Sequence, residues 1–273
     1  MQNDAVQPRS DMNSHRLRSD HVILLFLVAC NLSLVIAYLL PWAMFGRIFF
    51  VFALDREANI PVWWSSAQLL LAGLFLGLVA LRTRTVEPYS WALGILAGIL
   101  VFMSAEETIG LHERLGAYVA RRLTGDLNAP AIETGVWIVV IGGPVILAML
   151  ALLNRLGAFL GSVPGTRRHL VYGFLVLLVG STAMEVFELF SPITTQQAFL
   201  FRHALEEFLE MTGGSILLWA SLLFAREHWS TQAVRTLFYP SSLSEKRAYD
   251  RIRAFQESGQ DPDPAATPVV SHR

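Results

Sequence analysis

Residues 201–226, with the sequence FRHALEEFLEMTGGSILLWASLLFAR, decide the fold. The second half of this stretch is apolar. The whole stretch is longer than the roughly 20 residues that a helix needs to cross a bilayer. The first half carries five ionisable side chains: Arg202, His203, Glu206, Glu207 and Glu210. The stretch therefore predicts a membrane-spanning helix with acid, base and cationic groups at one end, and raises the question of what those groups face.

The composition of the whole chain is typical of a membrane protein. Of its 273 residues, 53% are hydrophobic and only 16% are charged, whereas soluble domains are nearer one quarter charged. The mean hydropathy is +0.46. A net charge of -1 without a basic stripe excludes nucleic acid as a partner. The single cysteine, Cys30, excludes a disulfide framework and a cysteine-based metal site.

Apolar runs of spanning length recur along the chain. They predict an all-α, polytopic integral membrane helical bundle with about six transmembrane helices. Small residues spaced four apart, Gly73 with Gly77 and Gly94 with Gly98, favour close helix packing in lipid. The six expected spans are 21–45, 61–82, 89–109, 134–156, 168–190 and 198–226.

The distribution of arginines predicts the orientation. Positive residues concentrate on the cytoplasmic side of membrane proteins. The larger arginine set includes the flank of the first span, so both termini are expected in the cytoplasm, with a prokaryotic inner membrane as the expected location. The expected organisation is a polar cytoplasmic N-terminus (1–20), a six-span domain (21–226) and a cytoplasmic tail (227–273) with a short amphipathic helix and a disordered end. That larger set is Arg9, Arg16, Arg18, Arg82, Arg84, Arg155, Arg167, Arg168, Arg226 and Arg235.

With this topology, ionisable groups gather at the outer ends of the third, fifth and sixth spans. At 1.5 Å per residue, Glu106 and Glu107 lie about 22–24 Å above Trp91, within the roughly 30 Å hydrocarbon slab. By the same rise, Glu185 and Glu210 lie at about that level in their own spans. A second level, nearer the interface, contains His112, Glu113, Glu188, His203, Glu206 and Glu207.

The depth of these carboxylates indicates that they face one another. An ionised carboxylate in hydrocarbon costs several kcal/mol unless it is paired or protonated. Three helices would each carry that cost at one height, so an outward-opening polar pocket inside the bundle is expected. Two simpler interpretations remain open. Lipid headgroups could solvate the ionisable groups of the outer level, or the acids could form ion pairs with arginines such as Arg114 and Arg202 that only fix helix packing.

Carboxylates together with imidazoles are typical of a divalent metal site for Zn, Mn or Fe. Glu106, Glu113 and Glu210 are the candidate catalytic or supporting groups. The expected function is a metal-dependent, hydrolase-like membrane enzyme acting on a lipid or amphiphilic substrate from the outer leaflet. The candidate metal ligands are His112, His203, Glu107, Glu185 and Glu207.

Two other functions remain open from the sequence. Intramembrane glutamate and histidine also mark proton or ion paths, which would suit a proton- or ion-linked transporter. The cytoplasmic halves of the spans consist mainly of Leu, Ala, Val and Gly, which favours a blind pocket over a conduit. A non-catalytic sensor or assembly subunit is the third possibility.

Overall fold

The computed structural model describes residues 10–54, 56, 58–85, 87–125, 138–184, 186–187 and 195–238, with the backbone alone at 10–20, 112–113, 120, 124 and 230–238. The described residues lie in helices or in the segments that connect helices, which confirms the predicted all-α class. The chain divides into two units, Met1–Arg226 and Glu227–Arg273, and the packing described below lies within the first. The helices in chain order are α1 (Ser10–Phe45), η1 (Phe50–Phe52), α2 (Ile60–Thr83), α3 (Ser90–Ile109), α4 (Leu111–Thr124), η2 (Ile138–Gly142), α6 (Gly143–Arg155), α7 (Gly157–Leu160), α8 (Thr166–Leu178), η3 (Val179–Ala183) and α10 (Gln196–Phe238).

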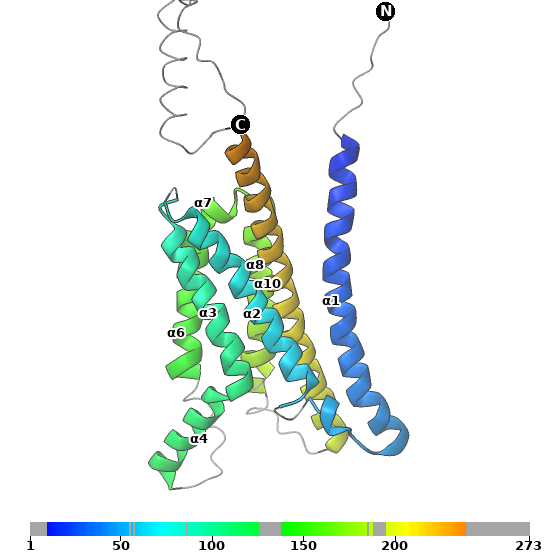
Figure 1. Cartoon of the computed structure of the whole chain (residues 1–273). Helices are drawn as coiled ribbons and strands as arrows, with labels where there is room; N and C mark the ends of the chain where they lie inside the picture. The colour runs from blue at the N-terminus through cyan, green and yellow to red at the C-terminus, as the bar shows by residue number, and fades with distance from the viewer. Residues whose placement is uncertain are drawn as a thin grey trace, which may run out of the picture. The chain divides into compact units, whose positions relative to one another are not determined.

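Five segments in the described part of the chain are long and apolar enough to cross a membrane (Figure 1). Each lies at a position where the sequence predicts a span. The sixth expected span, 168–190, begins as α8 and continues as the π-helical η3, and its remainder falls partly outside the described residues. The count of six spans therefore stays a prediction. The five segments are His21–Phe45, Ile60–Thr83, Ser90–Ile109, Ile138–Arg155 and Gln196–Trp229.

Large apolar side chains cover the outer faces of these helices. Leu25 on α1 is 67% exposed, Leu147 on α6 is 69% exposed and Val139 on η2 is 73% exposed. Soluble monomers rarely expose apolar surface on this scale. The exposed faces are therefore compatible with contact to lipid.

Helices α2 and α3 form a tight hairpin. Asn59 caps α2, its side chain accepting a hydrogen bond from the Val62 backbone N–H at 3.1 Å, and Pro61 suits the first turn because it needs no donor there. A Cβ at Gly73 would lie 2.9 Å from the Ala97 carbonyl oxygen of α3. The predicted small-residue packing is thus closest at Gly73, while Gly98 has open space around it.

A buried polar network joins α1, α2 and α10. The Asn31 side chain donates to Ser215 Oγ at 3.0 Å and accepts from Trp64 Nε1 at 2.7 Å. Gln68 Nε2 also donates to Asn31, and Ser215 Oγ donates to Gln68 Oε1 at 2.7 Å. Asn31, Gln68 and Ser215 are each no more than 1% exposed. Their hydrogen bonds to one another offset the cost of burying polar groups among apolar helices.

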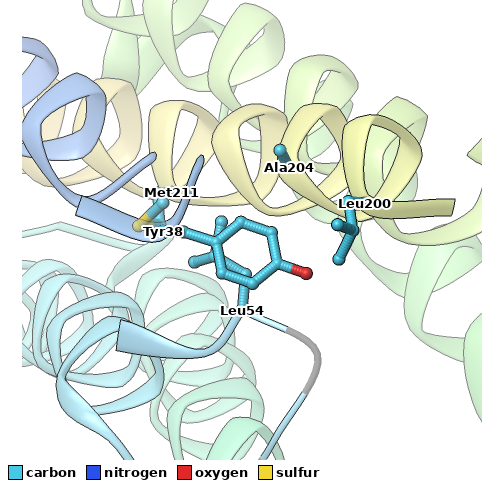
Figure 2. Close-up of a cluster of buried hydrophobic side chains, with 5 residues drawn as sticks. All are labelled: Tyr38, Leu54, Leu200, Ala204 and Met211. Atoms are coloured by element: carbon cyan, nitrogen blue, oxygen red, sulfur yellow. The ribbon is translucent and has the colours of Figure 1, made fainter. Parts of the chain in front are cut away.

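An apolar cluster packs the loop between α1 and α2 against the beginning of α10. Figure 2 shows Tyr38 of α1 and Leu54 of the loop beside three α10 side chains, Leu200, Ala204 and Met211. Asn59 ties down the same loop by donating to the Ala53 and Arg56 carbonyls. The described part of this loop is thereby held close to the ionisable segment of α10.

Candidate functional site

The end of α3 supplies the first carboxylates of the site. Gly110 takes the left-handed conformation (φ 60°) and its N–H donates to the Glu106 carbonyl at 2.8 Å, which ends the helix directly after its acidic turn. The Ser66 hydroxyl of α2 donates to the Ser104 carbonyl at 2.8 Å and lies 2.9 Å from the Ser104 hydroxyl. These contacts fix the last turns of α3, and with them Glu106 and Glu107.

The α10 helix brings two more carboxylates to the same place. Glu207 and Glu210 follow each other at i, i+3 and so project from one side of α10. One ligand oxygen from each of Glu107, Glu207 and Glu210 can be chosen so that all three lie within 4.8 Å of one another. We call these three residues the glutamate cluster. One Glu207 oxygen, Oε2, is buried and makes no hydrogen bond among the described residues.

Close packing of η3 on α10 positions Glu210. A Cβ at Gly180 would lie 2.7 Å from Glu210 Cγ and 3.1 Å from the Glu206 carbonyl oxygen, so only glycine lets these helices approach so closely. A Cβ at Gly213, one turn further along α10, would similarly strike Leu177 of α8. The glutamate cluster is therefore held by backbone contact as well as by its own helices.

A cavity of about 140 Å³ adjoins the glutamate cluster. Its polar lining comes from Glu106, Glu107 and Glu210 with the hydroxyls of Ser65, Ser181 and Thr182. The remaining wall is almost entirely apolar and is contributed by α2, α3, η2, α6 and α8. Both π-helical segments, η2 and η3, border it. Such segments are rare and occur frequently at functional sites.

The other ionisable groups of α10 form a separate contact. The Arg202 guanidinium lies 3.4 Å from Glu206 Oε2, and His203 Nδ1 lies 3.3 Å from the same oxygen. The His203 ring also packs edge-on against Phe199. The spacing of His203, Glu207 and Glu210 predicts one shared face, but the structure brings only the two glutamates to Glu107 and leaves His203 with Arg202 and Glu206.

The remaining predicted ligands lie where their side chains are not described. His112 and Glu113 belong to the first turn of α4, of which the structure gives the backbone, and Glu185 lies outside the described residues. Their assignment as metal ligands or catalytic groups stays a prediction. Glu106, the other predicted catalytic residue, lines the cavity beside Glu107.

Comparison with known families matches most of the chain to one of them. The family model described as "Domain of unknown function (DUF8692)" matches residues 22–225. The chain belongs to this family. The match to DUF8692 includes Glu106, all three members of the glutamate cluster and the Asn31 network. No curated protein and no solved structure matches the chain.

The Asn31 network was not predicted from the sequence. The sequence does contain a signal for it, because one amide lies in each of two largely apolar runs: Asn31 in "VACNLSLV" and Gln68 in "SSAQLLL". A polar side chain within a span requires a partner, and the pair could have been assigned to each other on that ground. The Ser66 contact with Ser104 gave no comparable signal, because serine is common in helices of this kind.

The glutamate cluster has a definite chemical requirement. Three carboxylates at this separation repel one another, and the repulsion is stronger in a medium that excludes water. Among the described residues, the lining of the adjoining cavity includes no lysine, arginine or histidine. A bound cation, shared protons or other polar groups of the chain can offset the negative charge. Carboxylate oxygens are the donors that hard divalent cations prefer, so this donor set fits a metal ion.

Proposed function

We propose that the chain is an integral membrane protein whose glutamate cluster binds a divalent metal ion, and that it acts as a metal-dependent enzyme on a lipid or amphiphilic substrate. The observation that carries the proposal is the convergence of Glu107, Glu207 and Glu210 within 4.8 Å at the edge of a largely apolar cavity. Two helices far apart in sequence contribute to it, and both are long and apolar enough to span a membrane.

The donor set supports a hard metal ion. Of the three metals that the sequence suggests, zinc commonly takes nitrogen or sulfur ligands, whereas manganese suits sites built from carboxylate oxygen. With His203 occupied by Arg202 and Glu206, the three glutamates favour manganese. A metal ion bound there would polarise an ester or amide carbonyl or lower the pKa of a bound water.

The chain's own residues have distinct roles in this proposal. Glu107, Glu207 and Glu210 bind the metal, while Glu106 lies at the cavity wall, where it can accept a proton from an attacking water. The apolar wall excludes bulk water and receives the hydrocarbon part of the substrate. An engineered apolar cavity of about 150 Å³ holds one benzene. A cavity of about 140 Å³ therefore suits a single chain segment or ring, and two acyl chains would not fit side by side.

The membrane placement is part of the same proposal. The exposed apolar faces of α1, η2 and α6 and the five span-length segments support insertion in a bilayer. The arginine distribution supports cytoplasmic termini and a site that opens toward the outer leaflet of a prokaryotic inner membrane. A reporter fused to the C-terminus tests this orientation, and a periplasmic signal would invert it.

Metal content is the direct test of the proposed site. Full-length protein purified in detergent is analysed by elemental mass spectrometry, as wild type and as the Glu107→Gln/Glu210→Gln variant. The amide removes the charge while keeping the size of the side chain. We expect one or two equivalents of metal in the wild type and background in the variant.

Matched variants make this result specific. Glu87→Gln makes the same chemical change in the segment between α2 and α3, away from the residues that line the cavity, and should retain the wild-type metal content. His203→Ala should also retain it, because His203 contacts Arg202 and Glu206 and not the cluster. Metal that persists in the folded double variant would overturn the ligand assignment. Absence of metal from a folded, metal-supplemented wild type would overturn the metal proposal.

A specific observation supports ion-linked transport as a second function. The sequence suggests that the cytoplasmic halves of the spans are apolar, yet the Asn31 network places buried polar groups beyond the cluster, on another side of α10. Ser215 lies five residues, or about 7.5 Å, further along α10 than Glu210. Proton flux into vesicles reconstituted with the wild type, absent with Glu210→Gln, would favour transport, whereas turnover without flux would favour the enzyme.

A further inference from the structure

The α4 helix presents a surface that the proposed function does not use. Four apolar residues recur on it at i, i+4, i+8 and i+12: Leu111, Leu115, Val119 and Leu123. This repeat places them along one side of the helix. Leu111 is 43% exposed and Leu123 is 69% exposed, so both ends of the stripe are open. A water-facing helix would carry polar side chains at these positions.

The charge of α4 is predominantly positive. Its 14 residues include Arg114, Arg121 and Arg122 against one acidic residue, Glu113. The Arg122 guanidinium lies 5.4 Å from the centre of the Tyr118 ring, and Tyr118 is 57% exposed. Arginine beside an exposed aromatic ring is typical of helices at a membrane interface, where the ring lies among headgroups and the cation reaches phosphate.

The position of α4 directly after α3 sets its depth relative to the membrane. Only Gly110 separates it from α3, and the left-handed conformation of Gly110 turns the chain there. Figure 1 shows α4 leaving the end of α3 at an angle to it. If α3 spans the bilayer, the first turn of α4 lies at the boundary between hydrocarbon and headgroups. Glu106 and Glu107 lie within one turn of this junction.

We propose that α4 binds the membrane surface, with Leu111, Tyr118 and Leu123 inserted at the level of the headgroups and with Arg121 and Arg122 bound to anionic lipid phosphates. This inference rests on the membrane placement of α3 proposed above and is independent of the metal. One partner, an anionic lipid surface, would contact both the exposed apolar stripe and the exposed Arg121 and Arg122. Bound in this way, α4 anchors the end of α3 and the acidic turn that precedes it.

Site-directed spin labelling of the full-length protein tests the proposal. Cys30, the single cysteine, is replaced by serine, and single cysteines are introduced at Tyr118 and Leu123. The labelled protein is reconstituted in vesicles of phosphatidylcholine alone or of equal parts phosphatidylcholine and phosphatidylglycerol. The accessibility of each label to oxygen, which concentrates in lipid, is compared with its accessibility to a water-soluble nickel complex.

Two further label positions serve as controls. Ala117 is exposed and projects from the side opposite the stripe, so its label should be accessible to the nickel complex in both vesicles. Ile95 of α3 is 48% exposed, does not line the cavity and reports whether α3 itself lies in lipid. We expect the oxygen-to-nickel accessibility ratio at Tyr118 and Leu123 to be several-fold higher than at Ala117 when phosphatidylglycerol is present. Arg121→Gln/Arg122→Gln should remove the part of this difference that depends on phosphatidylglycerol.

The possible outcomes separate the two proposals. A lipid-exposed label at Ile95 with water-exposed labels at Tyr118 and Leu123 would overturn the inference about α4 alone. A water-exposed label at Ile95 would overturn the membrane placement on which it rests. Equal immersion in both vesicles would refute the role of anionic phosphate. Immersion that changes with the protein-to-lipid ratio would assign the stripe to contact with a second copy of the chain.

Discussion

Two groups of polar side chains, one buried around Asn31 and one half-buried in the glutamate cluster, lie in the same apolar bundle and differ in how their polarity is compensated. Around Asn31, amide and hydroxyl groups from α1, α2 and α10 donate to and accept from one another. In the glutamate cluster, three acceptor groups meet, and the buried Glu207 Oε2 makes no hydrogen bond within the described residues. The members of the first group pair with one another, whereas the second brings together three acidic groups whose charge a cation or protons could offset.

The largest expected difference between the two groups is their response to metal. A metal ion that binds only the folded protein stabilises it by about 2.7 kcal/mol when the free metal concentration is 100 times the Kd. We expect manganese to raise the unfolding temperature of the wild type and to leave that of Glu107→Gln/Glu210→Gln unchanged. Without metal, the double variant should be the more stable protein, because it lacks the carboxylate repulsion. A wild type that does not respond to any divalent metal would contradict the comparison.

The Asn31 network should show the opposite behaviour. Asn31→Ala leaves the Trp64 N–H and the Gln68 amide without their acceptor and is expected to destabilise the protein by about 2 kcal/mol, with or without metal. Ser33→Ala is the matched control, since Ser33 is exposed on the same helix and bonds only to its own backbone at Ala29 among the described contacts. Thermal unfolding in detergent measures both. Equal effects of the two substitutions would remove the structural role assigned to Asn31.

A smaller effect is expected at the contact that positions the cluster. Gly180→Ala should cost about 1 kcal/mol or more of stability, since its methyl group would strike Glu210 and the α10 backbone. It should also weaken metal binding by displacing Glu210. Gly98→Ala, where the new methyl group meets open space, should leave stability and metal binding unchanged. Metal is titrated into both variants, and the unfolding temperature is measured at each metal concentration. Undiminished metal affinity in Gly180→Ala would show that η3 does not position Glu210.

The sequence predicted the helices well because lipid imposes length and hydropathy on them. The expected span 61–82 differs from α2 by one residue at each end, and the expected span 89–109 differs from α3 by one residue at its beginning and ends at the same residue. The depth argument also predicted that Glu107 and Glu210 share a level. It could not predict side-chain direction: helical periodicity alone placed His203 with Glu207, whereas the neighbouring Arg202 and Glu206 hold it elsewhere. Direction depends on rotamers and on contacts between helices, which a single-helix pattern does not contain.

The π-helical segment η3 makes the structure sensitive to the deletion of a single residue. Its hydrogen bonds run from i to i+5, so it accommodates one more residue per turn than an α-helix. Deleting one codon within Val179–Ala183 would restore an ordinary helix and leave its hydropathy almost unaltered. Because the π turn absorbs the one residue that is removed, the residues beyond the deletion would keep nearly the same direction relative to α8. The deletion would instead change the turn that holds Gly180 against Glu210 and places Ser181 and Thr182 at the cavity wall. A one-codon deletion here should therefore yield a protein that is made and inserted but has an altered cavity.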